Sequence, residues 1–218
     1  ILAFPDVQVL DVTGPLEVFS LANRLSEGRG PRYAVSVIAP GTGPVVTSSG
    51  LPIVAGRRLR QAIGQVDTLI VAGGQGTRAA MFDRQLVSWI RRAALAARRV
   101  ASVCSGAFLL GEAGLLDGRR ATTHWAVCAS LQRRYPKARV ERDPIFVRDG
   151  KISTAAGVTA GMDLPLDLVE EDRGRDLALA VARHLVLFLH RPGGQAQFSV
   201  QLSAQVAERR GLRDLQGF

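Results

Sequence analysis

Residues Val100–Leu110 read Val-Ala-Ser-Val-Cys-Ser-Gly-Ala-Phe-Leu-Leu, and this stretch decides the fold. Its first half is apolar and lacks polar alternation, as in a strand buried on both faces of a parallel sheet. Small residues follow Cys104, and then a helical pattern that continues through Ala113. A turn of this kind places Cys104 at the carboxyl edge of the sheet, beside the free N–H groups of the next helix.

The same alternation of buried strands and amphipathic helices continues on both sides of this stretch. Further strands are predicted at Leu2–Phe4, Tyr33–Ala39, Val66–Ala72 and Arg99–Val103, helices at Pro15–Leu25, Asp83–Arg98 and Arg175–His190, and a hairpin over Ala138–Thr154. Strands that alternate with helices favour right-handed crossovers and a parallel sheet. The sequence therefore predicts an α/β sandwich with a mostly parallel central sheet.

Composition excludes several classes of protein. The chain has 218 residues, of which 47% are hydrophobic and 22% charged, so a disordered chain is excluded. Leu177–Leu189 is too short to span a bilayer and reads as a buried core helix, so we expect no membrane association. Two cysteines form neither a disulfide framework nor a metal-ligand pattern, and a reducing, cytoplasmic location is expected.

The net charge of +9 invites a nucleic-acid interpretation, because 28 basic residues stand against 19 acidic ones. The arginines, however, are scattered in pairs such as Arg57-Arg58, Arg91-Arg92 and Arg209-Arg210. We expect most of them to lie on solvated faces rather than in one groove.

Cys104 has two interpretations. The helix N-terminus after it would favour a thiolate and make the cysteine nucleophilic or oxidisable. Alternatively, it packs as a small hydrophobic residue, which is a common fate of cysteine. These residues alone do not separate the two.

Three other features are candidate partners of Cys104, and each has a purely structural explanation. His124, in Ala-Thr-Thr-His-Trp, is a possible base or ligand contact but also a typical surface or capping histidine. Glu17 is expected in the first turn of a helix, where acids complement the dipole without any function. Gly73-Gly74 ends a strand and can present backbone N–H groups to an oxyanion, or simply form a tight turn.

Taken together, these motifs resemble the ThiJ/PfpI superfamily. The residues that carry the resemblance are Phe4–Phe19, the Ala72-Gly73-Gly74 turn, Val103–Gly106 and Ala121–Trp125, within a match from Ile1 to about His190. The family implies a flavodoxin-like sandwich related to class I glutamine amidotransferases. By this resemblance, Cys104, Glu17 and His124 are catalytic if the protein is an enzyme, and the ligand lies against Gly73, Gly74, Cys104, Ser105 and His124.

Two branches of the superfamily are similar to this chain. One is the stand-alone isonitrile hydratase type, which shares the opening motif and the Ala-Thr-Thr-His-Trp segment. That branch is expected to carry an aspartate at the position of Glu17, and commonly a threonine after the cysteine in place of Ser105. The other branch is the GlxA-like group of AraC-type transcription regulators, in which a helix-turn-helix domain follows.

The segment Phe188–Ser199 resembles the join between the two parts of such a regulator, so we favour the regulator. Residues 1–190 are then a ligand-sensing domain, and residues 191–218 a connector with a helical tail leading to a helix-turn-helix domain that these residues do not contain. The partners implied are a small-molecule effector, a second copy of the chain and DNA through that domain. No cofactor or metal is expected, and an enzyme that is a cysteine-dependent hydratase or amidase is the alternative. A weaker third possibility is a redox sensor that oxidises Cys104.

Overall fold

The computed structural model describes residues 1–26, 30, 32–62 and 66–196. Its central sheet has the strand order β5 (Thr68–Val71), β6 (Arg99–Val103), β10 (Ile152–Ala155) and β9 (Phe146–Asp149). β5 and β10 both pair in parallel with β6, and β9 is antiparallel to β10. All residues of β6 and β10 are buried, which explains the absence of polar alternation in their sequences.

The N-terminal segment continues the sheet beyond β5. Leu2 bridges in parallel both to Val71 of β5 and to Ile38 of β1 (Ile38–Ala39), and β1 in turn pairs with β4 (Arg57–Arg58). The predicted α/β fold class with a mostly parallel sheet is confirmed.

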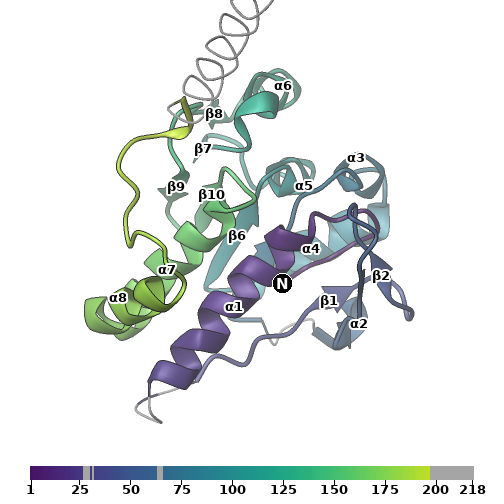
Figure 1. Cartoon of the computed structure of the whole chain (residues 1–218). Helices are drawn as coiled ribbons and strands as arrows, with labels where there is room; N and C mark the ends of the chain where they lie inside the picture. Colours follow the sequence, from purple (N-terminus) through teal and green to yellow (C-terminus); the bar gives the residue numbers. More distant parts are fainter. Residues whose placement is uncertain (27–29, 31, 63–65, 197–218) are drawn as a thin grey trace, which may run out of the picture.

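Helices cover both faces of the sheet. In Figure 1, α1 (Val9–Leu25), α7 (Ala160–Arg173) and α8 (Arg175–His184) lie in front of the sheet, and α4 (Arg84–Ala96) lies behind it. α4 buries one stripe, which includes Trp89 and Ile90 and supplies part of the hydrophobic core. α5 (Gly106–Glu112) begins directly after the turn that follows β6 and packs beside α4.

Shorter elements complete the fold. They are β2 (Val45–Val46), β3 (Pro52–Ile53), α2 (Leu59–Ala62), α3 (Thr77–Ala80), β7 (Arg120–Ala121), the 3₁₀ helix η1 (Trp125–Val127), α6 (Cys128–Arg134) and β8 (Arg139–Val140). The predicted hairpin is present as β9 and β10, but Arg139–Val140 pairs in parallel with β7 instead of joining it.

Three helix predictions need correction. α1 begins at Val9 rather than at Pro15, and Pro15 lies inside it. The helix predicted over Arg175–His190 ends at His184, after which Val186 has φ +55° and is 91% exposed. α7 was not predicted at all. The helical tail predicted after Pro192-Gly193-Gly194 falls outside the described residues beyond Ala196.

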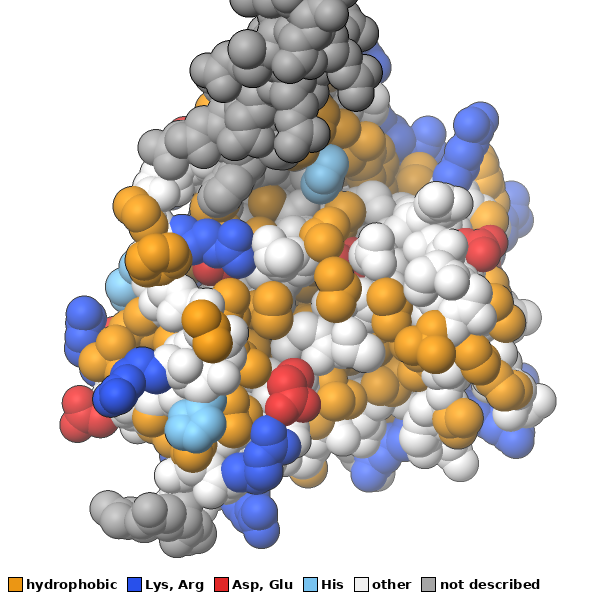
Figure 2. Space-filling model, viewed as in Figure 1, with side chains coloured by type: hydrophobic (Ala, Val, Ile, Leu, Met, Phe, Trp, Pro, Cys, Tyr) orange, Lys and Arg blue, Asp and Glu red, His pale blue; other side chains and the backbone are white. Residues whose placement is uncertain are grey.

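In the described part of the chain, no helix is both long and apolar enough to cross a membrane. Figure 2 shows basic side chains scattered around the rim of one face, without a continuous patch.

Candidate functional site at the carboxyl edge of the sheet

Cys104 follows β6 in a strained turn. Its φ is +55°, a left-handed conformation that is costly for a residue with a Cβ atom. The Cys104 N–H donates to the carbonyl of Ala155 at the end of β10 (3.0 Å). Gly157 then lies against the cysteine: a Cβ atom at that glycine would be 2.2 Å from Cβ of Cys104. The predicted turn therefore exists, and the ends of two parallel strands hold it.

The carboxylate at this site belongs to Asp11. Its side chain is completely buried and accepts two backbone hydrogen bonds, from Gly73 N to Oδ2 (3.0 Å) and from Val158 N to Oδ1 (2.9 Å). Val158 also has a positive φ, +52°, which is rare for a β-branched residue. Asp11 thus joins α1 to the turns that follow β5 and β10, on either side of Cys104.

Burial shifts the pKa values of both Asp11 and Cys104. Desolvation raises the pKa of Asp11 to about 6, although its two backbone hydrogen bonds oppose the shift. Desolvation, followed by the negative charge of Asp11, raises the pKa of the Cys104 thiol to about 12, while the N–H and hydroxyl of Ser105 act in the opposite direction. Burial thus acts against the thiolate that the helix N-terminus would favour, while the Ser105 N–H and hydroxyl act toward it.

Glu17 does not lie at the cysteine. Its carboxylate pairs with Arg24, which lies two turns further along α1 (2.7 Å), and its side chain is 46% exposed. Because α1 begins six residues before Pro15, Glu17 lies in the interior of the helix, and Asp11 takes the position expected for the acid. In this chain, therefore, Asp11 rather than Glu17 is the acid that lies beside Cys104.

The N–H groups of Gly73 and Gly74 are engaged within the protein. Gly73 N donates to Asp11, and Gly74 N donates to Oγ of Ser105 (2.9 Å). The Ser105 hydroxyl is in turn 2.8 Å from Oγ1 of Thr77. Both glycines allow close packing, since a Cβ atom at Gly73 would lie 2.5 Å from the Ser105 nitrogen. The two glycines support the cysteine turn. Because their N–H groups already have acceptors in the protein, they do not form the open oxyanion hole that the sequence predicts.

His124 follows a residue that contacts the cysteine turn, but within the described residues none of its hydrogen bonds is to Cys104. The preceding residue, Thr123, donates from Oγ1 to the carbonyl of Cys104 (2.7 Å). The Nδ1 atom of His124 accepts from Ala126 N (3.4 Å) and caps η1, and the ring lies against Trp125. Burial lowers the pKa of His124 below its usual value. Its capping role is therefore the one that the structure displays.

The connector after α8 docks on both sides of this site. Arg191 donates to Oδ1 of Asp163 (2.8 Å) and to the carbonyl of Thr159 (3.0 Å), next to Val158. Gln195 is 4% exposed, and its Nε2 donates to the carbonyl of Thr123 (3.1 Å).

Asp143 fixes the backbone of the same segment. Its carbonyl accepts from Gln195 N (2.7 Å), and its carboxylate accepts from Ala196 N (2.9 Å). Residues Arg191–Ala196 are thus part of the folded domain rather than a free tether, although the sequence predicts that the domain ends at His190.

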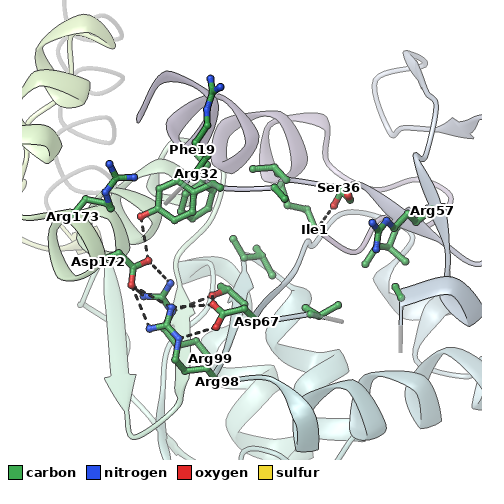
Figure 3. A pocket seen from close by; sticks show the side chains of 18 residues that line it. Ile1, Phe19, Arg32, Ser36, Arg57, Asp67, Arg98, Arg99, Asp172 and Arg173 are labelled. Carbon is green, nitrogen blue, oxygen red and sulfur yellow. Dashed lines mark hydrogen bonds and ion pairs between the residues drawn. The ribbon is translucent and has the colours of Figure 1, made fainter. Parts of the chain in front are cut away.

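A cavity of about 530 Å³ lies at the opposite edge of the sheet (Figure 3). Arg99 at the start of β6 lines it, together with Asp172, which accepts from Arg99 (2.7 Å) and from the hydroxyl of Tyr33 (3.1 Å). Cys104 follows the last residue of the same strand, so the length of β6 separates this cavity from the cysteine. Across the described ranges, no three His, Cys, Asp or Glu residues are grouped to hold a metal.

The roles of Asp11 and Gly157 and the docking of the connector were missed because these residues reach the site through long-range contacts. A signal for Asp11 was present: it is a single carboxylate between Leu10 and Val12 in an otherwise apolar run. The apolar neighbours of such an acid are expected to be buried, and an acid buried with them needs hydrogen-bond partners. Nothing local in the sequence marks Gly157 or Gln195.

The parallel sheet, the strained cysteine after its central strand and the buried acid from the first helix define an α/β protein with a nucleophile-type turn. The family model described as "DJ-1/PfpI family" matches residues 1–171, and the chain belongs to this family. The predicted resemblance to ThiJ/PfpI proteins is confirmed.

Relatives of two kinds match. Isonitrile hydratase of Pseudomonas putida is 38% identical over 84% of this chain and 75% of its own length. The HTH-type transcriptional regulator CdhR of Pseudomonas aeruginosa is 34% identical over 97% of this chain, which spans 60% of that regulator. The crystal structure of an AraC family transcriptional regulator from Pseudomonas putida superposes with a TM-score of 0.74 at 26% identity, covering 84% of this chain and 96% of that chain.

Proposed function

We propose that this chain is the effector-sensing and dimerising domain of an AraC-type transcription regulator. A small polar metabolite binds beside Cys104, against Gly73, Gly74, Ser105 and His124. Residues 191–218 lead to a separate helix-turn-helix domain that binds DNA, so the protein acts in the cytoplasm as a homodimer. The regulator relatives support this proposal because CdhR is 34% identical to this chain over 97% of its residues.

One structural observation carries the proposal: the connector is bonded to the walls of the cysteine site. On one side, Gln195 donates to Thr123, whose hydroxyl donates to the Cys104 carbonyl. On the other side, Arg191 holds Thr159, beside the Val158 N–H that donates to Asp11. A ligand that displaces either wall changes the contacts available to the connector. A binding event is coupled to a distant domain only through such differential contacts.

The first experiment tests the coupling through Gln195. In a Cys128→Ser background, which leaves one thiol, we measure the rate at which iodoacetamide alkylates Cys104. Gln195→Ala is expected to raise this rate roughly 3-fold to 10-fold, because the Thr123 wall loses its anchor and opens more often. The matched control is Gln132→Ala, since Gln132 also donates to a backbone carbonyl, that of Ala138, but in α6. Equal alkylation rates of Cys104 in the two variants would show that Gln195 is not coupled to the cysteine site.

Linkage makes the effect reciprocal, and a second readout uses this. Alkylation of Cys104 is expected to speed hydrogen exchange at the amides of Gln195 and Ala196, both of which donate to Asp143. Unchanged exchange at these amides after full alkylation contradicts the proposal. The whole regulator is tested separately by the mass of the native gene product, which is expected to contain about 100 further residues with a helix-turn-helix pattern.

A second candidate function is a cysteine-dependent enzyme similar to isonitrile hydratase. Its specific support is the buried Asp11, whose pKa of about 6 suits proton transfer near neutral pH beside a nucleophilic thiol. Steady turnover of an isonitrile or amide that Cys104→Ser and Asp11→Asn both abolish would establish the enzyme. Saturable binding without turnover, retained in Cys104→Ser, supports the sensor.

A further inference from the structure

A second concave surface lies away from the cysteine, between β4, α2 and α4. Its volume is about 600 Å³, and its lining includes four arginines, Arg58, Arg60, Arg84 and Arg92, which we call the arginine groove. Thr42, Gln85 and Ser88 add polar side chains, and no lining residue is acidic. Its charge is therefore uniformly positive.

The four guanidinium groups differ from most other arginines of the protein. Within the described ranges, none of them forms a side-chain hydrogen bond or an ion pair with the protein. By contrast, Arg98, Arg99 and Arg134 each pair with a carboxylate. The nearest acid in sequence, Asp83, accepts from the backbone N–H groups of Gln85 and Leu86 as the cap of α4. These four positive charges of the groove thus have no counter-charge among the described residues.

The two walls of the groove present like charges to one another. Arg84, Ser88 and Arg92 follow at intervals of four residues and form one row on α4, about 12 Å long. Arg58 and Arg60 come from β4 and α2 on the other wall. Like charges that share a surface without counter-ions repel, and an anionic ligand removes this repulsion.

We propose that the arginine groove binds the phosphate backbone of double-stranded DNA. Arginine, serine, threonine and glutamine side chains are the groups that contact phosphates in protein–DNA complexes, and all four types line this groove. The four arginines are exposed, so a long polyanion reaches all of them, whereas recognition of a small anion relies on buried donors. The contact is independent of sequence and adds to any that a separate DNA-binding domain makes.

The test uses the 218-residue chain alone, so its result does not depend on the proposed regulator function. Binding to a short fluorescent duplex of mixed sequence is followed by anisotropy over a range of salt concentrations. We expect weak binding at low salt that is lost as salt rises. Replacing Arg84 and Arg92 by Gln is expected to weaken binding and to reduce the slope of log K against log salt by about 2.

The matched control is Arg139→Gln with Arg183→Gln, which removes the same charge from two exposed arginines outside the groove. It is expected to change the slope little. Equal losses in the two double variants would show attraction by net charge only, and absence of binding at low salt would also overturn the proposal. Displacement of the duplex by inorganic phosphate at low concentration would instead identify a small-anion site. Circular dichroism verifies that both variants fold.

Discussion

At the residue scale, the site depends on backbone atoms that approach one another closely. Cys104 keeps its positive φ because Ala155 accepts its N–H and Gly157 leaves room for its Cβ atom. Such strain persists only where surrounding contacts over-determine the conformation. Glycine at position 157 is therefore a requirement of the cysteine turn rather than a feature of a generic loop.

We expect Gly157→Ala to cost more than about 3 kcal/mol of unfolding free energy, because its methyl group overlaps Cys104 and its φ is +105°. Gly114→Ala is the control: Gly114 has φ +73° but nothing within 4 Å of an added Cβ atom, so a loss of about 1 kcal/mol is expected. Urea unfolding of both variants measures the difference. Equal losses would mean that the space beside Cys104 is not limiting.

At the element scale, the sequence predicted β5, β6 and α4 well, since buried strands and an amphipathic stripe are local patterns. Of the strand predicted over Tyr33–Ala39 only Ile38–Ala39 forms, and Leu2–Phe4 supplies only the bridges at Leu2. The sequence misplaced the start of α1, because proline favours the first turn of a helix and Pro15 was taken to mark it. That error moved the expected acid from Asp11 to Glu17. α7 was missed because Pro165 and five acidic residues obscure its stripe, while its burial comes from packing on α1 and α8.

The C-terminal end of α7 is tied to the start of β6 by Asp172 and Arg99, whose side chains are 15% and 9% exposed. Asp172→Asn removes the closer of the two carboxylates that pair with the buried Arg99 guanidinium and leaves only the more exposed Glu171 (3.5 Å), and a loss of about 2 to 3 kcal/mol is expected. Asp67→Asn breaks the more exposed pair with Arg98 and is expected to cost at most about 1 kcal/mol. Guanidinium unfolding curves compare the two, and similar losses would contradict the ranking.

At the scale of the whole molecule, the two edges of the sheet have different chemistry. The amino edge holds paired charges around Arg99 and Asp172, whereas the carboxyl edge holds the buried Asp11 and the partly buried Cys104, whose pKa values are both raised. Sequence motifs located the second edge through Cys104. They did not locate the first, nor the arginine groove, because side chains far apart in the chain form both.

The raised pKa of Asp11 makes stability depend on pH. The unfolded chain loses the Asp11 proton near its ordinary pKa of 3.8 and the folded protein near 6, so this contribution to stability is lost as pH rises through that interval. The unfolding free energy of the wild type minus that of Asp11→Asn is expected to fall by roughly 3 kcal/mol from about pH 4 to pH 7. Taking the difference cancels the remaining carboxylates. A constant difference would contradict the assignment.

The docked connector also bears on how anything joined after Ala196 is held. A free linker lets its attached module explore a volume that grows with linker length. Here Arg191 and Gln195 are both anchored, and only Pro192, Gly193 and Gly194 lie between the anchors. A Cβ atom at Gly194 would lie 2.3 Å from the Asp143 carboxylate, so the backbone between the two anchors is tightly packed against Asp143. Ala196 is therefore held at one fixed position on the domain, and inserting a single residue between the anchors would shift that position without lengthening the protein appreciably.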